Sequence, residues 1–218
     1  MAKRIAIFAG HYGSGKTNIA VNYALHLKKQ GLGVKIADLD IVNPYFRTKD
    51  SAATLEAAGI ELISPAFANT NVDLPALPQE LYGLVHRKDH HAVLDVGGDD
   101  RGAYALGRYT PYILEENDYD MFFVVNFYRP LTRTPEEALE VMREIETAGG
   151  IPFTAIINNS NLGGHTTPED ITATREKTEA LSRISGLPVA MTCARADIAG
   201  EGQFPLTLQE KYFDIKEI

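Results

Sequence analysis

The chain has 218 residues, of which 44% are hydrophobic and 23% are charged, the balance of an ordinary globular protein. The formal net charge of −8 argues against nonspecific nucleic-acid binding, which needs a basic surface. A single cysteine, Cys193, excludes an internal disulfide and a Cys-x-x-Cys site. No stretch reaches the roughly 20 apolar residues of a membrane helix, and the apolar N-terminus is too short for a signal peptide. We therefore expect one cytoplasmic domain over residues 1–218, with no membrane anchor and no direct contact to nucleic acid.

Apolar and polar segments alternate along the chain in a way that predicts an α/β fold. The expected strands are residues 3–9, 33–38, 60–63, 91–95, 119–126, 151–157 and 187–192. The expected helices are residues 17–30, 51–58, 78–86, 103–115, 134–149 and 167–184, with a partly helical stretch over 206–218. Thr134 and Glu137 predict a capping box, and Thr167 predicts a second N-cap. The pattern indicates one doubly wound, mostly parallel sheet of about seven strands flanked by helices, with its strand ends along one edge.

The turn between the first strand and the first helix matches the phosphate-binding pattern G-x-x-x-x-G-K-[ST] in full. Its glycines let backbone N–H groups converge on phosphate oxygens, and the following helix adds the positive end of its dipole. We expect Lys16 to reach the β- and γ-phosphates and the Thr17 hydroxyl to bind Mg²⁺. The residues expected to bind nucleotide here are Gly10, His11, Tyr12, Gly13, Ser14, Gly15, Lys16, Thr17 and Asn18.

Acidic residues follow two of the other expected strands. Asp38 and Asp40 are two residues apart, so their side chains share a face if the strand geometry persists. Beside a phosphate loop, such carboxylates hold Mg²⁺ or its waters, or position an attacking water. Asp95 suits the same metal, and with Gly98 it reads D-x-x-G, where the glycine N–H can reach a γ-phosphate. The alternative for each aspartate is a turn former or a solvated loop acid.

These motifs, together with Asn159 after a hydrophobic strand, resemble the MinD/ParA family of P-loop ATPases over nearly the whole chain. The resemblance implies ATP and Mg²⁺ as cofactors and a homodimer that depends on nucleotide. Carried over by position, the family's site residues are Lys16 and Thr17 for phosphate and Mg²⁺, Asp38 beside the metal, Asp40 for the hydrolytic water, Asp95 as the Walker B aspartate and Asn159 for the base.

One position departs from that family. Many members carry a signature lysine directly after the first loop glycine, and here that position is His11. In those members the lysine reaches the nucleotide of the partner subunit, and a histidine can replace its charge only weakly. Three alternatives follow: hydrolysis is slow, Arg47 or Arg101 supplies the charge, or the dimer is built differently.

The residues after the sixth strand bear on which base is bound. Residues 158–161 read Asn-Asn-Ser-Asn and lack the lysine and aspartate of the N-K-x-D guanine motif. An asparagine amide can pair with adenine through its donor and its acceptor together. We therefore expect ATP rather than GTP, with the backbone around Arg195 closing over the base.

The leading functional hypothesis is a Mg-ATP-dependent switch ATPase that controls a homodimer or a protein-partner surface. Tyr45, Phe46 and Arg47 are candidates for that surface, because exposed aromatic residues with arginine are common anchors. One alternative is an ATP-dependent small-molecule enzyme similar to dethiobiotin synthetase, with a substrate pocket formed by the proline-rich residues 64–77, an expected surface loop. Another is a nucleotide-binding module with little hydrolysis.

Overall fold

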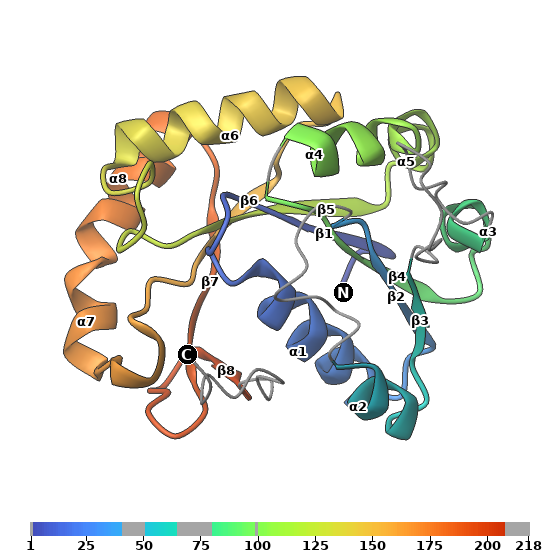
Figure 1. Cartoon of the computed structure of the whole chain (residues 1–218), viewed down its shortest axis with the longest axis horizontal. Helices are drawn as coiled ribbons and strands as arrows, with labels where there is room; N and C mark the ends of the chain where they lie inside the picture. Colours follow the sequence, from blue (N-terminus) through green and yellow to red (C-terminus); the bar gives the residue numbers. More distant parts are fainter. Residues whose placement is uncertain (1, 41–50, 65–79, 99, 208–218) are drawn as a thin grey trace, which may run out of the picture.

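The computed structural model describes residues 2–40, 51–64, 80–98 and 100–207, and every structural statement below refers to them. In this part of the chain, eight strands form one sheet in the order β3-β2-β4-β1-β5-β6-β7-β8 (Figure 1). All of the pairings are parallel. The strands are β1 Ile5–Ala9, β2 Val34–Asp38, β3 Glu61–Ile63, β4 His91–Asp95, β5 Tyr119–Val125, β6 Ala155–Asn158, β7 Val189–Arg195 and β8 Phe204–Leu206. The predicted doubly wound α/β fold is confirmed.

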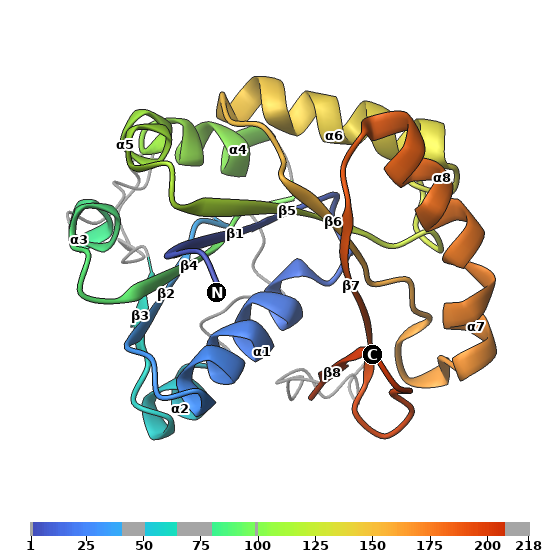
Figure 2. The ribbon, with the colours of Figure 1, turned by 180° about the vertical axis from the view of Figure 1, so that it is seen from behind.

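Helices cover both faces of the sheet. The first two lie on one face, and most of the others lie on the opposite face (Figures 1 and 2). Their bounds are α1 Lys16–Lys29, α2 Ala52–Ala57, α3 Glu80–His86, α4 Asp100–Gly107, α5 Thr110–Glu116, α6 Pro135–Gly149, α7 Pro168–Ala173 and α8 Arg175–Ser185, with a 3-10 turn at Gly163–His165. None of the described helices is long and apolar enough to cross a membrane.

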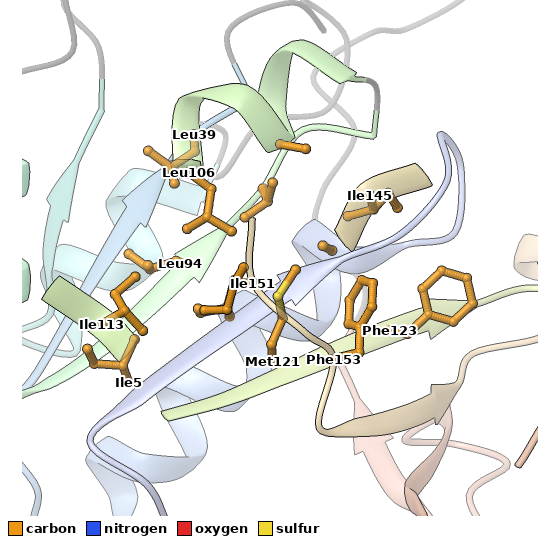
Figure 3. Close-up of a cluster of buried hydrophobic side chains, with 14 of the residues drawn as sticks. Ile5, Leu39, Leu94, Leu106, Ile113, Met121, Phe123, Ile145, Ile151 and Phe153 are labelled. Atoms are coloured by element: carbon orange, nitrogen blue, oxygen red, sulfur yellow. The ribbon is translucent and has the colours of Figure 1, made fainter. Parts of the chain in front are cut away.

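The strands alternate their side chains between two apolar cores, as a sheet buried on both faces requires. In β1, Ala6 and Phe8 pack toward α1, whereas Ile5 and Ile7 pack toward α3–α6. Figure 3 shows the second core, in which strand residues such as Leu94 and Phe123 meet helix residues such as Leu106. This alternation also decides which face each site residue of the strands points to.

The strand order places β1 at the topological switch point of the sheet. The chain passes from β1 to β2 on one side and reaches β5 on the other, so β1 pairs with both β4 and β5. Open parallel sheets bind ligands outside the carboxyl ends of their strands at such a point. The loop after β1 carries the phosphate-binding motif and therefore lies where the fold favours a ligand.

Two predicted helices are each divided in the structure. The expected helix 103–115 is α4 and α5, and Pro111 lies in the first turn of α5, where its missing N–H is tolerated. The expected helix 167–184 is α7 and α8, with Thr174 between them. The Thr174 hydroxyl accepts a hydrogen bond from Asn158 Nδ2 at 3.0 Å. Both predicted capping residues, Thr134 and Thr167, are confirmed as N-caps.

The last strands differ most from the prediction. β7 continues to Arg195, past the predicted end at 192, because its carboxyl half pairs with β8. β8 was not predicted, and Leu206 was placed in a partly helical stretch instead. A three-residue strand containing Pro205 shows no clear alternation, and proline is tolerated at a sheet edge. Residues 208–218 of that stretch lie outside the described residues.

A buried ion pair holds the amino end of the sheet together. Arg4 forms a bidentate pair with Glu116 at the end of α5, with Nη2 2.6 Å from Oε2. The same guanidinium donates to the carbonyls of Leu84, Val85 and Arg87 at the end of α3. These contacts satisfy carbonyl groups that a helix C-terminus leaves unpaired. The hydrogen bond from Arg4 lowers the pKa of Glu116 from its ordinary value of 4.5.

We expect Glu116→Gln to lower the free energy of unfolding by roughly 3 kcal/mol, because it leaves the buried Arg4 charge without a counter-ion. The pKa of Glu116 is depressed in the folded state, so its contribution is full above pH 4.5 and is lost as the pH falls through the lower, folded value. The difference between wild type and variant in urea unfolding should therefore shrink below that pH. Glu179→Gln, which breaks the exposed Arg175–Glu179 pair, is the control and should cost less than about 0.5 kcal/mol. If the two substitutions lowered the free energy of unfolding equally, the stabilising role of the buried Arg4–Glu116 pair would be contradicted.

Candidate functional site

The P-loop, residues 10–17, leaves β1 and enters α1 in a conformation that depends on glycine. A Cβ at Gly10 would lie 2.3 Å from the carbonyl oxygen of Val124 in β5. Gly15 caps α1 in the left-handed region, with φ at 85°, which glycine adopts without steric cost. The N–H of Ser14 donates to the carbonyl of His11 at 3.1 Å and closes the turn. The loop is therefore held against the sheet by its backbone.

Asn159, at the end of β6, anchors the P-loop from the other side. Its Nδ2 donates to the carbonyl of Ser14 at 2.7 Å, and a Cβ at Gly15 would lie 2.3 Å from the same nitrogen. The backbone N–H of Asn159 donates to Val125 at 2.8 Å, which fixes the residue to β5. The structure thus gives Asn159 a positioning contact, and its contact to a base stays a prediction.

The loop after β4 packs directly on the P-loop. A Cβ at Gly98 would lie 2.8 Å from the backbone nitrogen of Tyr12 and 3.0 Å from Nζ of Lys16. Lys16 is only 4% exposed and forms no ion pair with any other described residue. Buried charges are normally paired, so this ammonium group is suited to an anionic ligand.

Asp38 and Asp95 lie side by side at the carboxyl ends of β2 and β4. They are register partners in the sheet, and they follow Ile36 and Val93, which face α1. Alternation therefore directs both carboxylates to the α1 face, and both residues are buried. The sequence and the fold together bring these two acids to the face that carries α1.

Asp40 is positioned by a turn and not by the strand geometry that the sequence suggested. β2 ends at Asp38, so the strand geometry does not persist and the shared-face argument fails. Instead, the N–H of Asp40 donates to Oδ1 of Asp38 at 2.9 Å, which makes Asp38 a turn former as well as a candidate ligand. A Cβ at Gly97 would lie 3.3 Å from Oδ1 of Asp40, so this carboxylate borders the loop after β4.

The residues present fit a nucleotide with Mg²⁺. Ser14 Oγ is buried and has no hydrogen-bond partner among the described residues, and such orphaned groups point to a missing ligand. Within the same residues, no three His, Cys, Asp or Glu side chains gather as a metal cage. Mg²⁺ beside phosphates needs only one or two carboxylates and keeps several waters. Thr17, Asp38 and Asp95 meet that requirement.

Two predicted site residues, Asn18 and Arg195, make contacts that lead away from the phosphate loop. Asn18 Oδ1 accepts from Asn22 at 3.2 Å, and Asn22 exchanges hydrogen bonds with Thr207 beyond β8. Arg195 pairs with Asp197 and donates to the carbonyl of Gly164 at 2.5 Å. The hydrogen bond between them raises the pKa of Arg195 and lowers that of Asp197. The Arg195 guanidinium thus joins two surface loops. Closure of the backbone around Arg195 over a base stays a prediction.

The remaining predicted residues are placed only in part. His11 Nδ1 lies 3.1 Å from the carbonyl of Tyr12, and the Tyr12 side chain is 54% exposed. Tyr45, Phe46 and Arg47 lie outside the described residues, as do residues 65–77 of the expected surface loop. Arg101 belongs to α4, and its side chain is outside the description.

Sequence reasoning missed Arg129, which the structure places on the P-loop. Arg129 follows β5, and its Nε donates to the carbonyl of Gly13 at 3.1 Å. No motif marks this arginine. The available signal was its place after a strand that borders β1, at the edge where the loops gather.

A separate cavity of about 370 Å³ lies between α7, α8 and β7. Its lining is mixed and includes Ile171, Val189, Arg175, Glu179 and Gln203. It contains none of the predicted site residues, so the candidate site is at the P-loop.

Comparison with known proteins shows similarity at the level of the fold. No family model matches the sequence, and no curated protein matches it. Among solved structures, the cell division protein FtsY from Thermotoga maritima is 17% identical, with a TM-score of 0.63 over 88% of this chain and 61% of that one. Chloroplast FtsY from Physcomitrella patens is 18% identical, with a TM-score of 0.58 over 97% of this chain and 64% of that one.

A third similar structure is the signal recognition particle 54 kDa protein from Aeropyrum pernix K1 in complex with GDP. It is 14% identical, with a TM-score of 0.54 over 88% of this chain and 41% of that one. The chain thus spans less than two thirds of the length of each of these proteins. At these identities the likeness establishes the α/β fold of P-loop NTPases. It does not support the MinD/ParA family in particular.

Because Gly98 contacts backbone of the P-loop, we expect Gly98→Ala to lower the free energy of unfolding by about 1–3 kcal/mol. The added methyl would meet the Tyr12 backbone at 2.8 Å, so one of the two loops must move. Gly83→Ala in α3, where nothing lies within 4 Å of the new Cβ, should be neutral or slightly stabilising. Thermal unfolding of both variants tests the contact, and a neutral Gly98→Ala would show that the loops separate without cost.

Proposed function

We propose that this chain binds a nucleoside triphosphate with Mg²⁺ in its P-loop and hydrolyses it as a nucleotide-dependent switch. The observation that carries the proposal is the buried ammonium of Lys16 at the N-terminus of α1, which forms no ion pair within the described part of the chain. The loop after β4 lies against it through Gly98. A buried cation at a helix N-terminus is a strong anion site. The P-loop fold shared with the FtsY structures supports the same reading.

Each site residue has a part in this proposal. Backbone N–H groups of the P-loop and Lys16 bind the phosphates, and Ser14 Oγ of the same loop has no hydrogen-bond partner among the residues that the structure describes. Thr17, Asp38 and Asp95 would hold Mg²⁺, which supplies charge neutralisation at the phosphates. Asp40 orients the attacking water and accepts its proton. The N–H of Gly98 would donate a hydrogen bond to the terminal phosphate.

ATP is the proposed nucleotide. Residues 158–161 lack the lysine and aspartate that read guanine, and the motifs resemble those of the MinD/ParA family. GTP is the second candidate, because the similar 54 kDa protein was solved with GDP. Direct competition between ATP and GTP for the wild-type protein separates the two.

The switch would act through the loops after β2 and β4. Gly98, in the loop after β4, contacts the P-loop, and Asp40, in the loop after β2, contacts Gly97. A nucleotide bound at the P-loop would therefore lie close to both of these loops. Loops ordered by a γ-phosphate and released on hydrolysis are a common switching device. The proposed output is a homodimer or a protein-partner surface.

We expect Lys16→Ala to weaken ATP binding at least about tenfold, because it removes charge-assisted hydrogen bonds to the phosphates. Lys29→Ala removes an exposed lysine from the far end of α1 and should bind as the wild type does. Isothermal titration with ATP and with GTP measures both effects. If the wild type binds neither nucleotide, the proposed function is wrong.

We expect Asp40→Ala to reduce ATP turnover by roughly 10²–10⁴, the usual contribution of a positioned general base, with ATP affinity largely retained. Because the variant keeps its ATP intact, light scattering should show its mass rise from 23.9 kDa to about twice that value only with ATP. Glu140→Ala, an exposed change on α6, should turn over ATP at the wild-type rate. A mass independent of nucleotide would count against the dimer, and unchanged turnover would remove Asp40 from the chemistry.

A further inference from the structure

We propose that Arg129 is a second phosphate-binding cation of this site, which acts beside Lys16 on the terminal phosphate of the triphosphate. The inference rests on the proposed function and adds a residue that no sequence motif identifies. Three observations support it: the position of the guanidinium, the fixed backbone of residue 129, and the guanidinium donors that remain available for a ligand.

The Arg129 side chain lies directly on the P-loop. Its Nε donates to the carbonyl of Gly13, and a Cβ at Gly13 would lie 3.5 Å from Nε and 3.8 Å from Cζ. Gly13 is one of the residues whose backbone forms the phosphate cradle. The guanidinium is therefore next to the bound phosphates of the proposed complex, from the β5 side of the switch point.

The backbone around Arg129 is fixed by a hydrogen-bonded turn. The N–H of Arg129 donates to the carbonyl of Asn126 at 3.1 Å, and the buried Thr132 hydroxyl donates to the same carbonyl at 2.8 Å. Asn126 Oδ1 accepts from the N–H groups of Tyr128 and Asn161, which joins this turn to the loop after β6. The arginine is thus presented from a preorganised turn, which lowers the entropic cost of using it.

The donors of Arg129 are only partly used. Arg4 and Arg195 each pair with a carboxylate, whereas Arg129 forms no ion pair within the described part of the chain. The single hydrogen bond of its side chain there uses Nε, which leaves both Nη groups for another acceptor. A guanidinium presents its donors as a planar fork that matches phosphate oxygens. Position 11, on the same loop, carries a histidine rather than a permanent cation, so Arg129 adds a second permanent cation to that of Lys16.

The test compares nucleotide affinities of Arg129→Ala, Arg129→Lys and the control Arg133→Ala. Arg133 is an exposed arginine four residues further along the same loop. Each protein is titrated with Mg²⁺ and a non-hydrolysable triphosphate analogue, then with the diphosphate, of the base that the wild type prefers. The melting temperature of each nucleotide-free protein shows whether the variant folds as the wild type does.

We expect Arg129→Ala to weaken the triphosphate analogue by about tenfold to a hundredfold and the diphosphate by clearly less, with an unchanged melting temperature. Arg129→Lys should recover part of the loss, because it restores the charge without the fork, and Arg133→Ala should match the wild type. Equal losses for both nucleotides, or equal behaviour of the two alanine variants, would overturn the inference while leaving the proposed function intact. If the wild type bound neither nucleotide, both the inference and the proposed function would be wrong.

Discussion

The candidate site depends on backbone contacts that only glycine permits. Gly10 lies against β5, Gly15 against Asn159 and Gly98 against Tyr12, each at a distance too short for a Cβ atom. These contacts join the ends of β1, β4, β5 and β6 around one loop. The cradle is therefore shaped before a ligand binds, and preorganised N–H groups bind anions without a further cost of reorganisation.

Much of the fold could be predicted because its signals are local. Apolar runs marked the buried strands, and the residues around Thr134 and Thr167 marked helix starts that the structure confirms. The errors arose where a tertiary contact decides the outcome. Thr174 separates α7 from α8 while its hydroxyl meets Asn158, and the carboxyl half of β7 is a strand because β8 pairs with it. Neither contact is indicated by the residues that surround it in the sequence.

The candidate site divides in the same way. Lys16, Thr17, Asp38 and Asp95 could be found because a motif or a strand end identifies them. Asn159 was predicted for a contact to the base, which stays a prediction, whereas its hydrogen bond to Ser14 joins residues 145 positions apart and could not be foreseen. Arg129 was missed because its significance is purely spatial: the carbonyl that it contacts belongs to a loop 116 positions away. The position of Asp40 was derived from a strand that in fact ends two residues earlier.

The Arg4–Glu116 pair lies at the opposite edge of the sheet from the P-loop, at the amino end of β1. It fastens the ends of α3 and α5 to the first strand with five hydrogen bonds from one side chain. The amino end of the sheet is thus held together by contacts that do not involve the P-loop. Segments at the carboxyl edge can then open as small local units while the rest stays closed, so that amide exchange there need not report on global unfolding.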